Sequence, residues 1–287
     1  MKLFLILAFI LFLLFVTAFI YGWYSFSLRL AAARHRVDEQ PESRPAGGVI
    51  SESEIAKLPP PVRTWLRNSG VVGKLPIRIT KLNQSGWIRL KPDQAEWTQS
   101  PSEQIINLAA PSFVWNVRMS LQGMPVLGMD QFIRGQGSMW ITLFGLIPIA
   151  RVGPQPKINQ SALLRFLGEI VWTPTAALSP WVEWMAIDER SARARMSVDG
   201  VSGEAVFHFS ESGDVERFVA LRYKKITDVR PTEWRADIKA VQTFQGIRIP
   251  SAIEATWILP EGTFTWYKFE ITHLEYEVGG RGSKGGI

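Results

Sequence analysis

Two sets of ionisable side chains are the best candidates for chemistry in this sequence. Arg165 and Glu169 lie four positions apart in a segment of helical periodicity, so their side chains can meet on one helix face. Such a pair in an apolar cleft can have perturbed pKa values, as at active sites, although an ion pair that fixes the helix to its neighbours explains the spacing equally well. Asp188, between two predicted strands, could supply an acid or simply form an acidic turn. An enzyme interpretation, such as an envelope hydrolase, would therefore depend on Glu169 and Asp188.

The remaining sequence contains little that indicates catalysis. The absence of cysteine excludes disulfides, thiolate nucleophiles, cysteine-ligated metals and a lipidated cysteine. There is no Gly-x-Ser-x-Gly, His-Glu-x-x-His or phosphate-binding loop motif. The histidines, at positions 35, 208 and 273, are too scattered to suggest a metal site. We therefore expect no metal and no cofactor, and a binding role is favoured over an enzymatic one.

The formal net charge of +6 raises the question of an anionic partner. The cations are spread among predicted strands, and no known nucleic-acid-binding module is present, so nucleic acid is not expected as a partner. Attraction to anionic lipid headgroups explains the basic balance more simply.

The N-terminal segment is typical of a membrane anchor. No charged residue occurs from Leu3 to Phe26, which is long enough for a helix to cross the hydrocarbon core of a bilayer. A cleaved signal peptide is the alternative, but the apolar run is longer than such peptides usually have. We predict a transmembrane helix over residues 1–28, followed by a juxtamembrane linker over 29–50.

The orientation of this helix is open. The arginines that follow it (Arg29, Arg34, Arg36) favour a cytoplasmic C-terminus under the positive-inside rule. A very short N-terminal tail carrying Lys2 is, by contrast, how bacterial signal anchors begin. We expect a single-pass protein of the bacterial inner membrane with most of the chain outside the cytoplasm.

The rest of the chain predicts an antiparallel β-rich domain over residues 51–278 and a flexible tail over 279–287. Ser51 and Glu54 have the spacing of a capping box, and a second short helix is expected over 62–68. Apolar and polar residues then alternate, and the region 182–276 predicts a meander of about seven strands. Earlier strands are expected over 77–82, 86–90, near Trp97, and over 113–119, 126–133 and 138–143.

One segment interrupts this pattern, because residues 159–172 have helical spacing, with Ser161 as a plausible N-cap. The predicted fold class is therefore α+β, mostly β. It consists of an N-terminal transmembrane helix followed by a large, curved, half-barrel-like antiparallel sheet with one packed central helix.

Tryptophan is unusually frequent, with 12 among 287 residues. Several of these residues gather near the central helix and the apolar run at 139–150, which could be buried or could form a lip that dips into the membrane. We predict that this region lines a site for an apolar ligand. Its candidate residues are Trp140, Leu143, Phe144, Arg165, Glu169, Trp172 and Trp184.

Six segments resemble an uncharacterised bacterial family, a domain of unknown function whose likeness covers residues 58–276. The resemblance implies a bacterial source and no activity. A looser architectural likeness is to Lol-type lipoprotein carriers, which implies a curved half-barrel closed by helices around an apolar cavity. The segments are LPPPVRTWLRNSGVVG (58–73), PSFVWNVRM (111–119), LLRFLGEIVWTPTAALSP (163–180), IDERSARA (187–194), AVFHFSESG (205–213) and GIRIPSAIEATWILPEG (246–262).

The sequence thus favours a membrane-anchored domain that binds an apolar ligand, a lipid or an acyl chain, in the bacterial envelope. The alternatives are the envelope hydrolase using Glu169 and Asp188, and a scaffold for protein interaction, which would expose an apolar patch rather than enclose one.

Overall fold

A computed structural model describes residues 1–39 and 48–279. Most of the predicted tail, and residues 40–47 of the predicted linker, lie outside the described residues.

The chain begins with one long helix, α1 (Lys2–Asp38). It is long and apolar enough to cross a membrane, a property shared by some signal sequences and core helices. The helix continues through residues 29–38, which the sequence suggested as part of a linker. It does so because Phe26, Leu30, Ala33 and Val37 recur at helical spacing and are buried against the sheet.

Two short helices follow the undescribed segment. Helix α2 (Glu52–Ile55) begins with the predicted capping box, in which Ser51 and Glu54 satisfy each other's backbone N–H groups. Helix α3 begins at Pro60, two residues earlier than expected, and ends at Asn68. A proline is well tolerated in the first turn of a helix, where its missing N–H group has no partner to lose.

The remaining elements form a single 14-stranded antiparallel sheet. Its order is β7-β6-β5-β4-β3-β1-β14-β13-β12-β11-β10-β9-β8, with the short β2 paired to β1. The strands are β1 (Ile77–Ile88), β2 (Thr98–Gln99), β3 (Ser102–Asn107), β4 (Ser112–Leu121), β5 (Met124–Ile133), β6 (Gln136–Leu143), β7 (Ile147–Val152), β8 (Val182–Asp188), β9 (Ser191–Val198), β10 (Val201–Phe209), β11 (Val215–Arg222), β12 (Thr232–Phe244), β13 (Ile247–Leu259) and β14 (Gly262–Val278).

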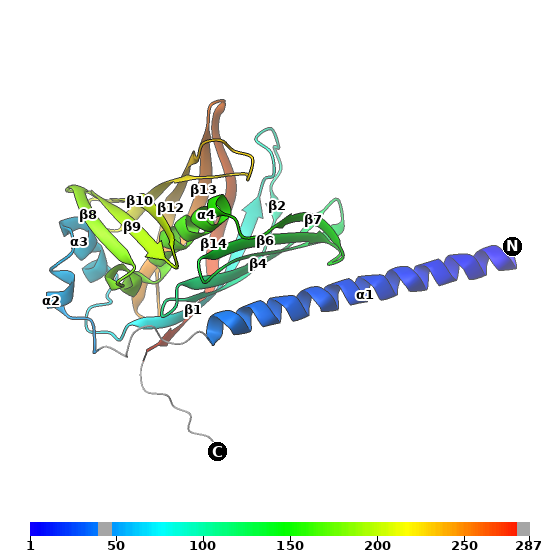
Figure 1. Cartoon of the computed structure of the whole chain (residues 1–287), viewed down its shortest axis with the longest axis horizontal. Coiled ribbons are helices and arrows are strands. Elements are labelled where there is room, and N and C mark those ends of the chain that lie inside the picture. Colours follow the sequence, from blue (N-terminus) through cyan, green and yellow to red (C-terminus); the bar gives the residue numbers. More distant parts are fainter. Residues whose placement is uncertain (40–47, 280–287) are drawn as a thin grey trace, which may run out of the picture.

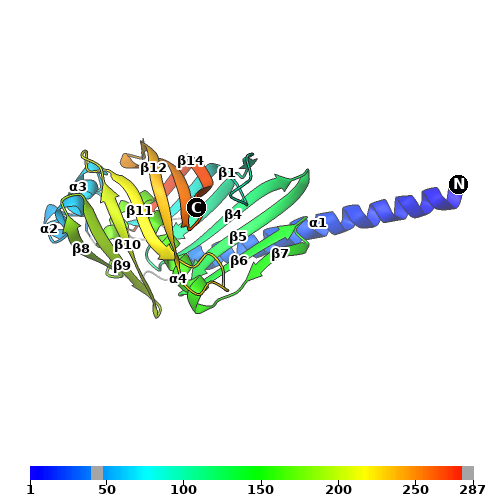
Figure 2. The same ribbon diagram turned by 90° about the horizontal axis from the view of Figure 1, so that it is seen from above.

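The sheet curls around the central helix α4 (Pro156–Glu169), as Figures 1 and 2 show. This helix contacts β5 and β6 in one arm of the sheet and β9, β10 and β11 in the other. Two short 3₁₀ turns, Ile170–Trp172 and Pro174–Leu178, continue the chain into β8. The half-barrel with one packed helix is therefore confirmed. The N-cap prediction is wrong, because Gln155 caps α4 and Ser161 lies within it, bonded to the backbone of Tyr223.

The two faces of the sheet are covered by different helices. On the inner face, which we define as the face toward α4, Phe113 and Phe132 pack against Phe166 of the helix. On the outer face, Val114 and Leu127 pack against α1. Alternate residues of one strand thus serve two separate cores, as the pleat of a β-strand requires.

Candidate functional site

A buried ion cluster lies on the inner face where α4 crosses the sheet. The guanidinium of Arg165 donates to Asp130 at 2.5 Å (Nη1–Oδ2) and to Glu169 at 2.7 Å (Nε–Oε1). Gln104 donates to the other oxygen of Glu169 at 2.6 Å. The same guanidinium lies over the ring of Trp115, 4.9 Å from its centroid. The two predicted residues Arg165 and Glu169 therefore do form a pair, with Asp130 as an unpredicted third member.

The pKa shifts in this cluster follow from burial and from attraction between its members. Burial raises the pKa of Glu169, against the opposing effects of Arg165 and Gln104. Burial alone would lower the pKa of Arg165, but attraction to Glu169 and Asp130 outweighs it and raises that pKa above its usual value. Arg165 stays charged with two carboxylate partners. The cluster therefore has the character of an ion network that fixes α4 to the sheet.

A second arginine on the inner face has no such partner. Arg222, the last residue of β11, lies over the ring of Trp234 at 4.5 Å and 5.9 Å from that of Trp257. Among the described residues no carboxylate pairs with it, and its Nε is buried without a hydrogen bond. Burial, reinforced by repulsion from Arg165, lowers the pKa of Arg222 to about 10, so it remains a cation at neutral pH.

Two further cations surround the rings beside Arg222. Cross-strand pairing aligns Trp234 with Trp257 and Trp257 with Phe264. Lys224 lies 5.4 Å and Arg89 6.0 Å from the Phe264 ring. Arg89 donates to backbone carbonyls, and neither residue has a carboxylate partner in the part of the chain that the structure describes. We call Arg89, Arg222 and Lys224 the cation cluster.

The inner face also keeps buried polar groups without partners. The indole N–H groups of Trp172, Trp234 and Trp266 are buried with no hydrogen bond, as is Oε1 of Gln104. Native proteins leave few such groups, and each requires a reason, such as water or a ligand that is not present. Half-buried aromatic side chains, including Trp115 and Trp266, pack at the margin of the same core.

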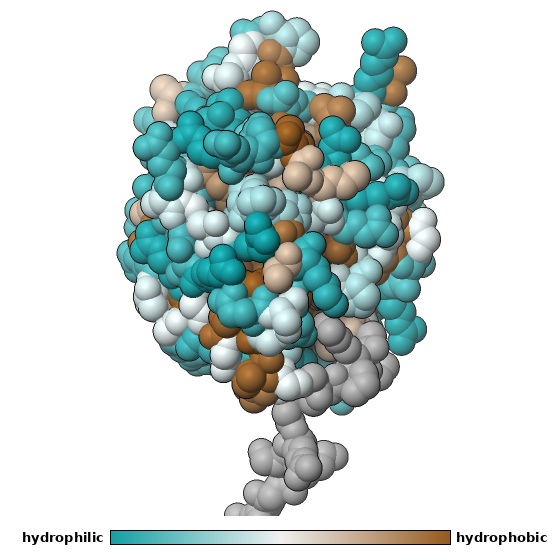
Figure 3. All heavy atoms as spheres, turned by 90° about the vertical axis from the view of Figure 1, so that its left-hand side faces the viewer, coloured by the Kyte–Doolittle hydropathy of each residue, from teal (hydrophilic) through white to brown (hydrophobic). Residues whose placement is uncertain are grey.

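The two ends of the strands differ. Helix α3 covers one end, where Asn68 donates to the carbonyl of Ser212 in the β10–β11 turn at 2.5 Å and Arg248 N–H donates to the carbonyl of Ser69. Trp65 of α3 packs there on Trp184 and Phe207. We call this end the capped edge. Its surface is mostly hydrophilic (Figure 3).

The opposite end carries the β4–β5, β6–β7 and β13–β14 turns and the loop after β11. We call it the hairpin edge. By strand register Arg222 belongs to this edge on the inner face. Lys224 follows in the exposed loop, and Arg89 follows β1 at the same edge, where it also lies 4.4 Å from the centroid of the Trp97 ring. An aromatic surface with unpaired cations therefore lies at the end of the half-barrel that α3 does not cover.

Within the hairpin edge, the β6–β7 turn lies beside the apolar half of α1, whereas the β13–β14 turn points away from that helix (Figure 1). Phe144, in the β6–β7 turn, packs its ring against Phe15 and Phe19. Contact is so close at Gly22 that a Cβ there would lie 2.4 Å from the carbonyl oxygen of Phe144. The next residues of the hairpin, Leu146, Ile147 and Ile149, are exposed. The apolar run at 139–150 is thus partly buried, and its remaining part is an exposed apolar turn alongside α1.

The predicted site residues are not all brought together. Arg165 and Glu169 lie on the inner face. Trp172 is buried against Phe269 beyond the end of α4, and Trp184 donates to the carbonyl of Ala177 near the capped edge. The other three belong to β6 and its turn.

Trp140 stacks on Phe26 of α1 on the outer face, with Arg29 over its ring. Phe144 packs on α1, and Leu143 is half-buried, paired with Val126. Alternation along β6 directs Trp140 away from α4, which sequence proximity alone does not reveal.

Asp188 lies in the β8–β9 turn. It accepts hydrogen bonds from the hydroxyl of Ser191 at 2.7 Å and from the backbone N–H of Arg190 at 2.8 Å, and these bonds lower its pKa. These contacts, all within one turn, are typical of an acidic turn between two strands. Glu169, by contrast, bonds to Arg165 and Gln104 inside the sheet, so the two carboxylates of the hydrolase hypothesis have separate partners.

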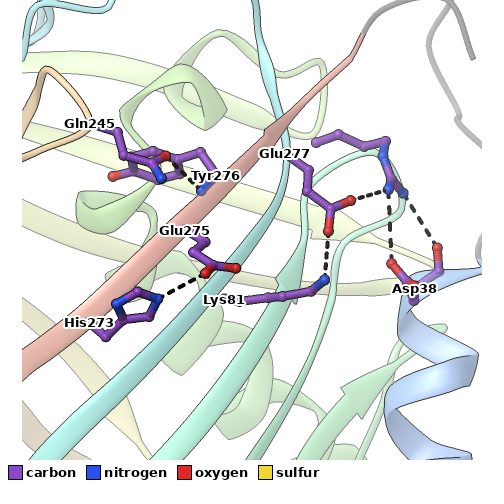
Figure 4. A network of polar contacts seen from close by, with 8 residues as sticks. Asp38, Lys81, Gln245, His273, Glu275, Tyr276 and Glu277 are labelled. Atoms are coloured by element: carbon purple, nitrogen blue, oxygen red, sulfur yellow. Dashed lines mark hydrogen bonds and ion pairs between the residues drawn. The ribbon is translucent and has the colours of Figure 1, made fainter. Parts of the chain in front are cut away.

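A groove of about 490 Å³ lies on the outer face between the end of α1, β1 and β14. Its charged side chains are largely paired with one another or with nearby residues, since Arg34 contacts Glu103 and Lys81 donates to Glu277 at 2.6 Å. Figure 4 shows the adjacent network, in which Glu277 joins β14 to Lys81 and Asp38 lies at the end of α1. These contacts tie α1 to the sheet and make the groove a weaker candidate than the inner face.

The fold and these faces define a curved antiparallel half-barrel with an N-terminal apolar helix. The sequence profile described as "Family of unknown function (DUF6544)" matches residues 48–269, so the chain belongs to that family. No curated protein matches the chain.

Among solved structures, the chain is similar to the crystal structure of a LolA superfamily protein from Nitrosomonas europaea. The two share 9% identity with a TM-score of 0.40, over 80% of this chain and 94% of the other. The likeness agrees with the Lol-type architecture expected from the sequence, and at this level it carries no functional argument.

The cation cluster was missed by sequence reasoning. A signal was present, because Phe218, Ala220 and Arg222 occupy alternate positions of one strand and therefore share a face. An arginine in phase with apolar residues on a strand is the pattern that could have indicated a buried cation.

Proposed function

We propose that this protein is anchored in a bacterial membrane by α1 and holds an acyl chain or a similar apolar ligand on the inner face of its half-barrel. The observation that carries the proposal is the asymmetry of the sheet. The capped edge is covered by α3, whereas the hairpin edge is not; it has aromatic rings on its inner face and includes the β6–β7 turn, which packs on the apolar half of α1. In this proposal the ligand enters the inner face over the β6–β7 turn, which is the part of that edge beside α1.

The membrane geometry follows from α1. Trp23 and Arg29 suit the headgroup boundary, and Phe15 and Phe19 lie four to eight residues deeper, which is about 6–12 Å along a helix. The hairpin residue that reaches this level is Phe144, and Leu146 lies beside Gly22. Leu146 and Ile147 are apolar and exposed. In this proposal the β6–β7 tip enters the hydrocarbon layer beside α1.

The depth of the hairpin can be measured directly, since the chain has no cysteine and accepts a single spin label. With the full chain in lipid nanodiscs, a label at Ile147→Cys should be accessible to oxygen and protected from a water-soluble relaxer. Glu189→Cys, in the exposed turn at the capped edge, serves as the control and should show the reverse. Equal accessibility at the two positions would exclude the membrane-dipping hairpin.

Ligand binding can be tested with the full chain in amphipol, titrated with a fluorescent polyene fatty acid that accepts energy from tryptophan. Ile238→Trp adds bulk on the inner face of β12 and should weaken binding by about tenfold. Lys239→Trp, next to it and exposed, should leave binding unchanged. No energy transfer in the wild type, together with no copurifying lipid by mass spectrometry, would refute the proposal.

The side of the membrane on which the domain lies is part of the proposal. We place it outside the cytoplasm of the inner membrane, following the short N-terminal tail. A C-terminal alkaline phosphatase fusion should be active, and a cytoplasmic reporter at the same position inactive; the opposite pattern would reverse the assignment.

A further inference from the structure

The cation cluster at the hairpin edge points to a ligand with an anionic head. This inference rests on the proposed function and deepens it. We propose that Arg222, with Lys224 and Arg89 beside it, binds the carboxylate or phosphate head of an acyl-chain amphiphile whose tail lies on the aromatic inner face.

The first argument is the state of Arg222. An arginine surrounded by protein normally has a carboxylate or several carbonyl partners, because removing a charge from water is costly. Arg165, on the same face, has both Asp130 and Glu169. Arg222 has two indole rings and no hydrogen bond among the described residues, and its Nε is buried without an acceptor. A planar fork of donors is thus left free.

The second argument is convergence. The three cations surround one cross-strand pair, Trp257 and Phe264, with Arg222 near the first ring and Lys224 and Arg89 near the second. None of the three has a carboxylate partner within residues 1–39 and 48–279. Asp130 and Glu169 attract Arg222 without bonding to it, and no carboxylate among the described residues bonds to the other two cations, so an anion that bonds directly to them is favoured.

The third argument is the place of the cluster in the fold. It lies at the end of the sheet that α3 does not cover, and the aromatic inner face continues from it toward Trp115 and Tyr267. A polar head at the edge and an apolar tail along the rings match this order of surfaces. The nearby carboxylates of Asp130 and Glu169 do not bond to Arg222, because both already bond to Arg165.

The test compares an acid with its neutral ester. The full chain in amphipol is titrated with cis-parinaric acid and with its methyl ester, and dissociation constants are measured by energy transfer from tryptophan. Arg222→Gln should weaken binding of the acid by about tenfold and change that of the ester by less than about twofold. Arg222→Lys, which keeps the charge, should retain most of the affinity for the acid.

The matched control is Arg217→Gln, on the same strand but on the outer face, where Arg217 pairs with Asp237 at 2.6 Å. It should leave both affinities unchanged. Thermal melts of each variant establish that the sheet is intact. An equal loss for acid and ester, or no loss of the acid in Arg222→Gln, would overturn the anionic-head proposal while leaving the apolar-ligand proposal standing. Failure of the wild type to bind either compound would refute both.

Competition distinguishes the sources of the anion. Phosphatidic acid should displace the probe, diacylglycerol should do so only weakly, and inorganic phosphate at millimolar concentration should not. Displacement by inorganic phosphate as effective as that by phosphatidic acid would show that the site takes a free anion, and would overturn the acyl-chain part of the inference.

Discussion

Arg222 and Arg165 show how two identical side chains on one face can have opposite roles. Arg165 is held by Asp130 and Glu169 and fixes a helix to the sheet. Arg222 lacks such partners, and burial lowers its pKa to about 10, so the folded protein holds this charge at a cost in stability. Residues retained at such a cost are commonly functional rather than structural.

Arg222→Met should therefore stabilise the ligand-free protein. Methionine keeps the length and apolar contacts of the side chain and removes a buried charge that has no bonded counter-ion, so we expect the free energy of unfolding to rise by about 1–3 kcal/mol. Urea unfolding at neutral pH measures it, with Arg217→Met as the surface control, expected to change stability by less than about 1 kcal/mol. A destabilised Arg222→Met protein would mean that stacking on Trp234 outweighs the desolvation of the charge.

Tyr267 provides a test by pH. Burial raises the pKa of Tyr267 to about 12, from a usual value of 10.0. Between these values the folded chain holds a proton that the unfolded chain has lost, so stability falls as the pH rises from 10 toward 12. Tyr267→Phe removes this dependence, and its free energy of unfolding should decline less over that window, by up to roughly 2 kcal/mol. Parallel curves from urea unfolding across the window would contradict the burial of this hydroxyl.

At the scale of residues, the sequence predicted the pair of Arg165 and Glu169 and did not predict the residues from other strands that surround it. Arg165 and Glu169 could be paired because helical spacing is local information. Asp130 comes from a strand 35 positions away in sequence from Arg165, and its contact is created only when the sheet curls. Arg222 was hidden for the same reason, since its isolation depends on which carboxylates other strands supply.

Among the elements, the β6–β7 hairpin has the most unusual surroundings. It is an edge hairpin whose turn packs on a helix from the other end of the domain, with Phe144 between Phe15 and Phe19. Its exposed isoleucines would invite aggregation on a protein fully surrounded by water. If α1 spans a bilayer as proposed, the same residues are surrounded by hydrocarbon and not by water.

Gly22→Leu should separate the hairpin from α1. A side chain at position 22 would meet the carbonyl oxygen of Phe144 at 2.4 Å and Leu146 at 2.5 Å, distances that force one element to move. Spin labels at Ile20→Cys and Ile149→Cys should report a distance longer by a few ångströms, about the bulk of the added side chain. Ala18→Leu, at an exposed position of α1, is the control and should leave the distance unchanged. An unchanged distance in Gly22→Leu would show that the contact at residue 22 does not hold the hairpin.

Strands were predicted correctly where one face of the strand is exposed to solvent and the other is buried. The seven strands from β8 to β14 were predicted as a meander, since most of them alternate cleanly between exposed and buried residues. Strand β3 was missed because both of its faces are buried, with Ile105 toward α1 and Ile106 toward the inner core, and alternation therefore disappears. The last turns of α1 were assigned to a linker because their arginines masked the period of Leu30, Ala33 and Val37.

At the scale of the whole molecule, α1 is part of the domain as well as a candidate anchor. Its last turns bury Phe26, Leu30, Ala33 and Val37 against the sheet, and Arg34 reaches Glu103 and donates to Asn116 at 2.6 Å. The outer face of β3, β4 and β5 therefore depends on α1 for its cover. The domain boundary drawn from the sequence between anchor, linker and sheet stays a prediction, and these contacts join its parts.

Deletion of residues 1–38 should consequently destabilise the sheet. Loss of these buried side chains removes roughly 5 kcal/mol of apolar stabilisation, which should lower the melting temperature by roughly 10 °C and expose a surface that binds a hydrophobic dye. Deletion of residues 1–20 keeps the packed turns and is the control, expected to melt close to the full chain in the same detergent. Identical melting of the two deletions would show that the outer face is stable without α1.

The continuity of α1 from its apolar half to its packed half limits how the domain can move. A half-barrel on a long tether could sweep a volume above the membrane and meet partners by three-dimensional diffusion. In the proposed arrangement, a half-barrel clamped to a membrane-spanning α1 travels only as fast as that helix drifts laterally. Its encounters would then be two-dimensional, and any donor or acceptor of the proposed ligand would have to reach the same patch of the same bilayer.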